Sequence, residues 1–545
     1  MRVTALCDVP SSFASCDCVR LSSFRSWEIL LPISFVFIAT NYIIDDVISL
    51  AKHIPQQSKA SGMYSFIVGQ SFVWSDVTDS ISYITFDAPK IIPRSPNLLY
   101  CIAMDKRVAD ILAKERRRQD EKLSMIPSEN FFSKSVRSAV GSEFMHKYSE
   151  GNIGARYYEG CEYIDELEQL TIDRAKEAFS LPDNWTANVQ ALSGSNANLA
   201  VYLALLEQGD TILSMYLPDG GHLSHGWSYE PKTSEDPQKM VYEGGSRKVN
   251  IVSRMFNVVQ YKTDPKTQLF DYDSIQELAE QRKPKLLISG GTAYPQLIDH
   301  QRMRAIADSV GAYYLADIAH EAGLIAAGVI PSPVGIADAV TMTTHKTLRS
   351  GRGAIILARE ELIKKINRAV LPGLQGGPHN HNIAGICVGL GEVNTPAYKE
   401  YAQSVVDNAI ALAKELSEKG FQIVSGGVAK HLILIDLTQQ PLLGKKFSKA
   451  LDVAGIVANY NTMPAESRSP ADPSAVRLGT PWITSRGMGK TEMSVIASYI
   501  AEVMGIAAEL DDDDFSIYNQ RVSSSKPLLA IAEKVKELCS KFPNE

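Results

Sequence analysis

Leu315-Ala316-Asp317-Ile318-Ala319-His320 and, further along, Thr343-Thr344-His345-Lys346-Thr347-Leu348 are the two stretches that decide the fold of this chain. Asp317 follows the apolar run Ala312-Tyr313-Tyr314-Leu315, which predicts a buried strand. Open α/β sheets bind ligands beyond the carboxyl ends of their strands, so we expect the Asp317 carboxylate in a binding site. Lys346 comes after another short apolar run, Ala339-Val340-Thr341-Met342, which is also a predicted strand.

A lysine paired with an aspartate in this way is typical of one cofactor chemistry. A lysine amine can hold an aldehyde cofactor as a Schiff base, and a carboxylate facing a pyridine nitrogen keeps that nitrogen protonated. The electron-poor ring then accepts carbanion charge, which indicates a pyridoxal phosphate enzyme. His345 lies next to Lys346 and is expected to influence the reactivity of its amine. An isolated Asp and Lys are more often a helix cap and a surface charge, so the pair needs support from other motifs.

Seven further motifs supply that support, in a fixed order along the chain. They are Ile126-Pro127-Ser128-Glu129-Asn130-Phe131, Lys147-Tyr148-Ser149-Glu150-Gly151, Arg156-Tyr157-Tyr158, Ser193-Gly194-Ser195, Leu217-Pro218-Asp219-Gly220-Gly221-His222-Leu223, Leu374-Gln375-Gly376-Gly377-Pro378-His379-Asn380-His381 and Arg477-Leu478-Gly479-Thr480-Pro481. Together with the Asp317 and Lys346 pair, they resemble the serine hydroxymethyltransferase family from about Met104 to the C-terminus.

The alternation of helix-like segments and short apolar runs predicts an α/β fold with a mostly parallel sheet and helices on both faces. The resemblance implies the fold type I of pyridoxal-phosphate-dependent transferases, with a smaller α+β C-terminal domain. We expect an unmatched segment over residues 1–103, an N-terminal arm over 104–165, a large cofactor-binding domain over 166–390 and a small domain over 391–545.

Several local elements follow from the sequence pattern. Arg107 to Lys122 and Ser133 to His146 are predicted helices, Gly420 to Val424 and His431 to Ile435 are predicted strands, and Ser228 to Asp236 is a predicted exposed loop. The other predicted strands are Thr211-Ile212-Leu213, Lys285-Leu286-Leu287-Ile288 and Ala354-Ile355-Ile356-Leu357.

Ser193-Gly194-Ser195 precedes a helix-like segment that starts at Asn196, so its hydroxyl and N–H groups are expected at a positive helix N-terminus. Such a terminus binds phosphate well, although a plain serine cap is the simpler reading of the motif alone. The resemblance favours the phosphate site. It also implies that Gly376 and Gly377 reach the cofactor phosphate of the neighbouring subunit in a homodimer.

The resemblance assigns roles to the remaining residues. His222 lies over the cofactor ring, His320 lies near its phenolic oxygen, and Thr292 and Tyr148 are further cofactor contacts. Arg477 binds the substrate carboxylate, because a guanidinium can hold it with two hydrogen bonds. Ser128 and Tyr158 are expected to assist Arg477. Glu150, beside Tyr148, is expected to handle the hydroxymethyl step and to come from the partner subunit. The residues expected to line a tetrahydrofolate pocket are Leu217, Gly221, Leu223 and Asn461.

The implied activity is the reversible transfer of the hydroxymethyl carbon of L-serine to tetrahydrofolate, which yields glycine and 5,10-methylenetetrahydrofolate. Two alternatives remain open. A folate-independent aldolase that cleaves β-hydroxy amino acids such as allo-threonine needs the same Lys, Asp and Arg, and a catalytically inactive relative with a binding role would keep the fold.

Three stretches depart from the family pattern. Ser350-Gly351-Arg352-Gly353-Ala354 stands where Gly-Pro-Arg-Gly-Gly is common, and Asn152-Ile153 stands where Tyr-Pro is common. Glu321 adds a carboxylate where an apolar residue is usual. We expect these changes to leave the cofactor in place and to affect folate affinity or rate.

Composition narrows the class of protein. The 545 residues are 45% hydrophobic and 21% charged, with a net charge of −7, so a large core is available and nucleic-acid binding is not indicated. Seven scattered cysteines form no disulfide framework, which fits the cytoplasm, and no metal site is expected.

The first hundred residues match no part of the family. Their apolar run from Ile29 to Thr40 is shorter than the roughly 20 residues of a spanning helix and has no cleavage site behind it, so membrane attachment and secretion are not expected. We expect translation to begin at Met104.

Overall fold

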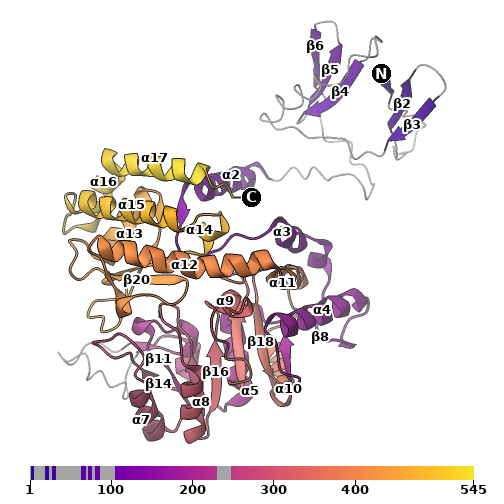
Figure 1. The fold of residues 1–545 in the computed structure, drawn as a ribbon. Coiled ribbons are helices and arrows are strands. Elements are labelled where there is room, and N and C mark those ends of the chain that lie inside the picture. Colours follow the sequence, from indigo (N-terminus) through magenta and orange to yellow (C-terminus); the bar gives the residue numbers. More distant parts are fainter. Residues whose placement is uncertain are drawn as a thin grey trace. The chain divides into compact units, whose positions relative to one another are not determined.

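The computed structural model describes residues 105–227 and 248–544 with their side chains, and the backbone of residues 228–229, 247 and of short strands between residues 2 and 85. The chain divides into two compact units, Met1–Ile111 and Leu112–Glu545, each described by itself (Figure 1). In the first unit, two antiparallel three-stranded sheets are formed by β1 (Arg2–Thr4), β2 (Val19–Ser23) and β3 (Trp27–Leu31), and by β4 (Met63–Val68), β5 (Ser71–Asp76) and β6 (Ser80–Thr85).

A seven-stranded sheet organises the second unit, with the spatial order β10-β18-β17-β16-β15-β11-β14. Strand β18 runs antiparallel to both of its neighbours, and the pairs from β17 to β14 are parallel. The strands are β10 (Trp185–Asn188), β11 (Thr211–Met215), β14 (Asn257–Tyr261), β15 (Leu286–Ser289), β16 (Tyr313–Asp317), β17 (Ala339–Thr343) and β18 (Ala354–Arg359).

Neighbouring parallel strands explain how Asp317 and Lys346 meet. Asp317 is the last residue of β16, and Lys346 lies in the turn just after β17. Because β16 and β17 are parallel, with Asp317 opposite Thr341, their carboxyl ends lie at the same edge of the sheet. The predicted position of the carboxylate at a strand's carboxyl end is therefore confirmed.

Helices cover both faces of this sheet (Figure 1). The core on one face includes Leu287, Tyr314 and Val340, and the core on the other includes Ile212 and Leu315, so successive strand residues point to opposite faces. The helices of this region are α3 (Lys134–Val140), α4 (Glu162–Ala178), α5 (Gly194–Leu205), α6 (Ile251–Met255), α7 (Tyr272–Arg282), α8 (His300–Ser309), α9 (Ala322–Ala326), α10 (Glu360–Arg368), α11 (Asn380–Val393) and the π-helical η5 (Ala369–Leu374).

The C-terminal part has its own core and an antiparallel sheet in the order β19-β20-β23-β22. The long helix α12 joins the two regions, because Tyr398 packs in the first core and Leu412 in the C-terminal one. The elements are α12 (Pro396–Glu418), β19 (Gln422–Ile423), β20 (Leu432–Asp436), α13 (Gly444–Val453), β21 (Ile456–Val457), β22 (Asn459–Asn461), β23 (Ala475–Gly479), α14 (Pro481–Ser485), α15 (Lys490–Ala508), α16 (Phe515–Ser523) and α17 (Lys526–Ser540).

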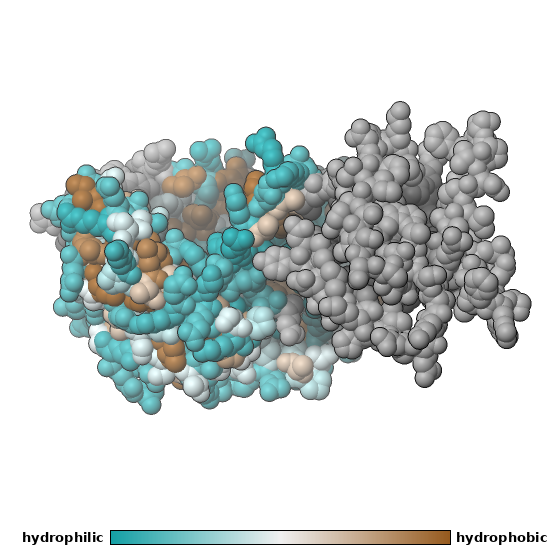
Figure 2. Space-filling model, turned by 90° about the horizontal axis from the view of Figure 1, so that it is seen from above, coloured by the Kyte–Doolittle hydropathy of each residue, from teal (hydrophilic) through white to brown (hydrophobic). Residues whose placement is uncertain are grey.

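Within the part of the chain that the structure describes, α15 alone is long and apolar enough to cross a membrane by length and composition. Its residues Met493, Ile496, Ile500 and Val503 are buried in the C-terminal core, which accounts for its hydropathy. On the face seen in Figure 2, hydrophilic residues predominate over the coloured part and apolar ones form small groups.

Some predicted elements differ from the observed ones. The first predicted helix is α2 (Lys106–Glu121), with Asp105 accepting the N–H groups of Arg107 and Val108 as its cap. The second is wrong in length: α3 ends at Val140, where Gly141 and Ser142 favour the helix poorly, and a separate 3₁₀ turn, η1 (Glu143–His146), follows.

In the C-terminal part, the strand predicted from Gly420 to Val424 is only β19, because Ser425 adopts a left-handed conformation with φ of 60° and Val424–Gly426 forms a 3₁₀ turn, η6. The predicted loop from Ser228 begins with β12 (Ser228–Tyr229), which pairs with β13 (Arg247–Lys248). Residues 230–236 of that predicted loop lie outside the described residues.

Short pairs complete the second unit. The strand β7 (Leu123–Ser124) pairs in parallel with β21, and β8 (Gly151–Asn152) pairs with β9 (Ala155–Arg156). Two 3₁₀ turns, η2 (Leu217–Asp219) and η3 (Leu223–His225), follow the carboxyl end of β11. The turns place the predicted motif that contains His222 at the same sheet edge as Asp317.

Candidate active site

A cavity of about 230 Å³ lies at the carboxyl edge of the sheet and brings together most of the predicted cofactor residues. Four strands, β11, β15, β16 and β17, end at it, and the N-terminus of α5 faces it. We call this cavity the cofactor pocket. Its lining is Ser193, Gly194, Ser195, His222, His225, Gly291, Thr292, Asp317, Ala319, His320, Thr343, His345 and Lys346.

Lys346 is buried in the cofactor pocket, and its turn is held by polar contacts. The amide of Asn130 donates to the Lys346 carbonyl oxygen (2.9 Å), and the hydroxyl of Tyr398 donates to the Thr347 carbonyl oxygen (2.9 Å). Burial lowers the pKa of Lys346 to about 8, against the opposing charge of Asp317. A substantial fraction of the amine is therefore neutral near pH 8, which is the form that attacks an aldehyde.

Asp317 accepts three hydrogen bonds. Its Oδ2 accepts from His225 Nε2 (2.9 Å) and from the amide of Asn198 (2.8 Å), and its Oδ1 accepts from the N–H of Ala319 (2.9 Å). Burial by itself raises the pKa of this carboxyl, but the hydrogen bond and charge of His225 outweigh burial and hold the pKa well below its usual range. Asp317 is thus a permanent anion at the floor of the pocket.

His225 and Asn198 were not predicted as site residues from the sequence. His225 comes three residues after His222, at the end of a 3₁₀ turn, and this spacing was the available signal. Ligand atoms of His222, His225 and Asp317 lie within 4.8 Å of one another, and the bond between His225 and Asp317 accounts for part of that closeness.

Three histidines of the pocket, His222, His320 and His345, are uncharged at neutral pH. Burial, together with the charge of His225, lowers the pKa of His222 to about 4, and burial with Arg352 lowers that of His345 to about 3. Burial also holds the pKa of His320 well below its usual value. The Nε2 atom of His320 is buried and has no hydrogen-bond partner, as expected for an atom that awaits a ligand.

The phosphate site predicted at Ser193-Gly194-Ser195 coincides with the start of α5. Ser193 is the N-cap and accepts from the N–H of Asn196 (3.4 Å). A Cβ on Gly194 would lie 2.7 Å from Thr343 Cγ2, so the close approach of helix and strand requires glycine there. The turn and the helix N-terminus suit an anion.

Arg477 lies in β23 and is buried beside the pocket. Its guanidinium donates to the Thr292 carbonyl oxygen (2.5 Å) and to Asn459 Oδ1 (3.1 Å). Burial lowers its pKa to about 10, which leaves it a cation at neutral pH. No carboxylate pairs with Arg477 among the described contacts, so its charge is available to a substrate carboxylate.

Tyr148, Glu150 and Tyr158 form a second group, which we call the tyrosine–glutamate group, and none of them lines the cofactor pocket. Tyr148 and Tyr158 donate to the two carboxylate oxygens of Glu150 at 3.4 and 3.3 Å, and their rings meet edge to face at 5.3 Å. Tyr158 therefore contacts Glu150 within one chain. The expectation that it assists Arg477 stays a prediction for an assembled dimer.

The glycine loop packs on this group. A Cβ on Gly376 would lie 2.9 Å from Glu150 Oε1, and one on Gly377 would lie 3.1 Å from the Tyr148 ring. Gln375, next in the loop, accepts from the N–H of Leu192 (3.3 Å), directly before the Ser193 turn. Both aromatic rings remain substantially exposed, Tyr148 at 55% and Tyr158 at 42%.

The residues predicted to bind folate lie on two segments. Leu217, Gly221 and Leu223 belong to the turns after β11, and Asn461 ends β22. Leu223 is 51% exposed, so it is not part of the hydrophobic core. Ser128 is half-buried and follows Pro127, which packs on the position of Gly479.

Asp219, between Leu217 and Gly221, was not predicted as a site residue. It is buried, and its Oδ2 accepts from the N–H (2.9 Å) and the hydroxyl (3.0 Å) of Thr263. Burial raises its pKa to about 6, against these hydrogen bonds. Asp219 thus ties the turn after β11 to the end of β14 with a group that titrates near neutral pH.

We expect Asp219→Asn to change how stability depends on pH. In the wild type the raised pKa adds stability that is fully present below about pH 4 and is lost as pH rises through 6, which amounts to about 3 kcal/mol. The Asn variant should gain stability relative to wild type between pH 4 and 7 in thermal unfolding scans. A constant difference across that range would contradict the assignment.

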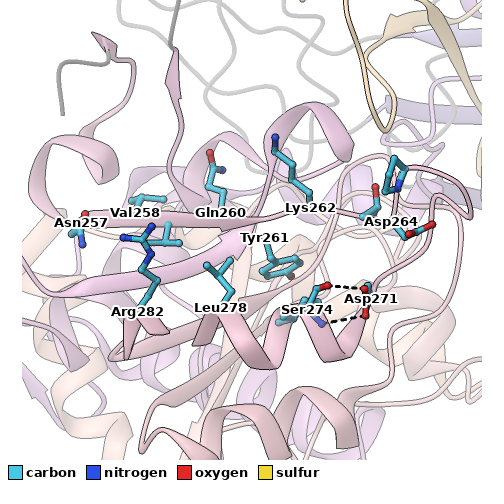
Figure 3. Close-up of a pocket in the computed structure, with 14 residues that line it drawn as sticks. Asn257, Val258, Gln260, Tyr261, Lys262, Asp264, Asp271, Ser274, Leu278 and Arg282 are labelled. Atoms are coloured by element: carbon cyan, nitrogen blue, oxygen red, sulfur yellow. Dashed lines mark hydrogen bonds between the residues drawn. The ribbon is translucent and has the colours of Figure 1, made fainter. Parts of the chain in front are cut away.

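Another hollow lies between the edge strand β14 and helix α7 and has a volume of about 420 Å³ (Figure 3). Gln260 projects from β14 and Lys262 from just beyond the end of this strand, and Leu278 and Arg282 project from α7 (Figure 3). None of the predicted site residues lines this hollow.

Two of the three departures from the family pattern, at Ser350 and Glu321, are accommodated by contacts within the chain. Ser350 is buried, and its hydroxyl donates to the Gly385 carbonyl oxygen (3.1 Å), so it braces the turn after Lys346. Asn152 is exposed in β8. Glu321 is buried and forms an ion pair with the buried Lys430, so the added carboxylate is neutralised within the chain.

A lysine and a carboxylate at the ends of adjacent parallel strands, opposite a helix N-terminus and within this sheet, define a pyridoxal-phosphate-dependent enzyme of fold type I. The family model for serine hydroxymethyltransferase matches residues 102–500. The chain belongs to the serine hydroxymethyltransferase family.

Curated relatives agree with the family match. Serine hydroxymethyltransferase from Acidothermus cellulolyticus is 46% identical over 450 residues, which cover 82% of this chain and 98% of the relative. The enzyme of the same name from Haloarcula marismortui is 47% identical over 420 residues, covering 77% and 95%. That from Sorangium cellulosum is 44% identical over 440 residues, covering 81% and 95%.

Proposed function

We infer that this protein transfers the hydroxymethyl group of L-serine to tetrahydrofolate, with glycine and 5,10-methylenetetrahydrofolate as products, and that it also runs the reverse reaction. The observation that carries this function is the pairing of Lys346 with Asp317 in a chain that the family model covers over residues 102–500. The reaction breaks the Cα–Cβ bond of serine. The site must therefore bind a carboxylate, stabilise carbanion charge and hold the folate.

We propose that pyridoxal 5′-phosphate is the cofactor held in the cofactor pocket. Three observations fit it: the buried amine of Lys346, the unpartnered Nε2 of His320 and the turn at Ser193 at the N-terminus of α5. Thr292 and the ring of His222 complete the wall. When bound, this cofactor accepts the electron pair left by the broken Cα–Cβ bond.

The chain's own residues supply position and charge. Lys346 offers a partly neutral amine near pH 8, and Asp317 keeps a negative charge that would stabilise a protonated ring nitrogen of the bound cofactor. Arg477 binds the carboxylate of the amino acid, with Ser128 assisting. His345, uncharged beside Lys346, shapes which substrates fit.

We propose that tetrahydrofolate binds against Leu217, Gly221, Leu223 and Asn461. The exposed Leu223 side chain supports this site, because it offers apolar surface beside the pocket. Cleavage of serine should then require tetrahydrofolate in a steady-state assay. Equal cleavage without folate, with turnover of allo-threonine, would favour an aldolase instead.

We further propose a cytoplasmic homodimer with shared sites, in which Tyr148, Glu150, Tyr158, Gly376 and Gly377 complete the partner's pocket. Two such dimers could assemble into a tetramer without changing these sites. Two exposed tyrosines beside a carboxylate, absent from the lining of their own chain's pocket, support this arrangement. The separate cores also support a large domain over 166–390 and a small domain over 391–545, after an arm over 104–165.

Mixing two inactive variants tests the shared site. When Lys346→Ala and Glu150→Gln subunits exchange at random, each mixed dimer has one site with both native residues and one site with neither. Activity should therefore recover to about one quarter of the wild-type value, because half of the dimers are mixed and each has one intact site. Absence of recovery after subunit exchange, confirmed by mass spectrometry, would place Glu150 in the same subunit's site.

A further inference from the structure

Glu321 and Lys430 form an ion pair in the interior that the reaction described above does not use. Lys430 has no exposed surface and Glu321 is 5% exposed. Glu321 directly precedes α9, and Lys430 lies two residues before β20, so the pair joins the cofactor-binding region to the C-terminal part. Charges buried this deeply are stable only when paired, so each residue depends on the other.

A histidine is the chain neighbour of each member of the pair. His320 comes just before Glu321, and His431 comes just after Lys430. The two imidazole rings stack at 5.5 Å with an interplanar angle of 20°, and His320 Nδ1 lies 3.2 Å from His431 Nε2. Two adjacent residues on one segment therefore meet two adjacent residues on the other.

The hydrogen bond between the rings sets their tautomers. Both rings are uncharged, because burial and the nearby cations Lys346, Arg477 and Lys430 hold their pKa values well below the usual value. One ring must therefore donate and the other accept. If His431 Nε2 donates, then His320 carries its proton on Nε2, the buried atom without a partner in the cofactor pocket.

Other groups face the ion pair as well. Lys430 lies 5.7 Å from the centroid of the Tyr294 ring, and the charges of both Glu321 and Lys430 act on His300. The segment before Lys430 is held by the N–H of Ala429, which donates to the Pro295 carbonyl oxygen (3.0 Å). No other carboxylate pairs with Lys430 among the described residues, so Glu321 alone neutralises it.

We propose that Glu321 and Lys430 are a positioning pair for the cofactor pocket: they hold His431 against His320, and so fix the direction and tautomer in which His320 Nε2 meets the cofactor. This inference rests on the proposed binding of pyridoxal phosphate. Loss of either charge leaves the other buried and unpaired, which displaces the segment that carries the neighbouring histidine.

The test compares Glu321→Gln with Asp338→Asn in the full chain. Asp338 pairs with Arg304 at 2.7 Å before β17, away from the pocket, and serves as the matched control. For each protein, the dissociation constant of pyridoxal phosphate from the apoprotein and the Tm of the apo and loaded forms would be measured. We expect Glu321→Gln to weaken cofactor binding about tenfold and to reduce the gain in Tm on loading.

The control should lower the Tm of both forms equally and leave cofactor binding unchanged. A double variant, Glu321→Leu with Lys430→Met, has no unpaired charge, so it should recover Tm but not cofactor affinity. Should Glu321→Gln fail to fold, the double variant decides, and wild-type affinity in it would overturn the proposal. Equal losses of Tm in the apo and loaded Glu321→Gln protein, with unchanged affinity, would show a structural pair only. A wild-type chain that does not bind the cofactor would instead refute the proposed function.

Discussion

Lys346→Ala is expected to abolish turnover of serine, with a loss of at least about 10³-fold, because the variant lacks the nucleophilic amine. Lys346 is buried, and its pKa of about 8 leaves enough neutral amine to attack an aldehyde at physiological pH. The measurement is steady-state formation of glycine from serine and tetrahydrofolate. Borohydride reduction followed by peptide mapping should label Lys346 in the wild type and nothing at this position in the variant.

The control for this prediction is Lys262→Ala, a lysine outside the cofactor pocket that lies near the end of β14. It should retain nearly wild-type turnover and be labelled normally at Lys346. Normal activity in Lys346→Ala, or labelling of another lysine with full activity, would contradict the assignment.

Asp317→Asn is expected to reduce kcat by about 10²- to 10³-fold, because the neutral amide no longer stabilises positive charge on the ring nitrogen of the cofactor. The side chain keeps its shape. However, His225 and Asn198 donate to Oδ2 and the N–H of Ala319 donates to Oδ1, so the amide nitrogen, which cannot accept, faces at least one donor in either orientation. We therefore expect cofactor affinity to fall as well, as measured by titration of the apoprotein.

Asn198→Ala separates charge from position. It removes a hydrogen bond of 2.8 Å to Asp317 but leaves the negative charge, so a loss of about tenfold or less in kcat is expected. If Asn198→Ala reduced kcat as much as Asp317→Asn does, the position of the Asp317 carboxylate rather than its charge would matter most.

Much of the cofactor pocket could be predicted from the sequence, because its residues follow short apolar strands directly. Asp317 ends β16, Lys346 follows β17 and Ser193 caps α5, so local pattern and chain order place all three at one edge. The parallel order of the strands, inferred from the alternation of helices and strands, explains why their carboxyl ends share an edge.

The partners of these residues could not be predicted, because they come from distant parts of the chain. Asn130 reaches the carbonyl of Lys346 from the arm before α3, and Asn198 reaches Asp317 from α5. Glu321 was noticed as a departure from the family pattern, but its partner Lys430 lies 109 residues further along, just before the C-terminal strand β20. Local pattern carries no information on such contacts, which depend on how helices and sheets pack.

By itself, the sequence determined the α/β class, the cofactor chemistry of Lys346 and Asp317 and membership of the family, because these depend on the order of motifs along the chain. Only the tertiary structure decided which atoms meet. It placed Glu150 with Tyr148 and Tyr158 outside the lining of the cofactor pocket, and it buried a charge pair behind His320. The physical reason is that burial and pairing of polar groups arise when distant segments pack together, and they set the pKa values and orientations on which the chemistry depends.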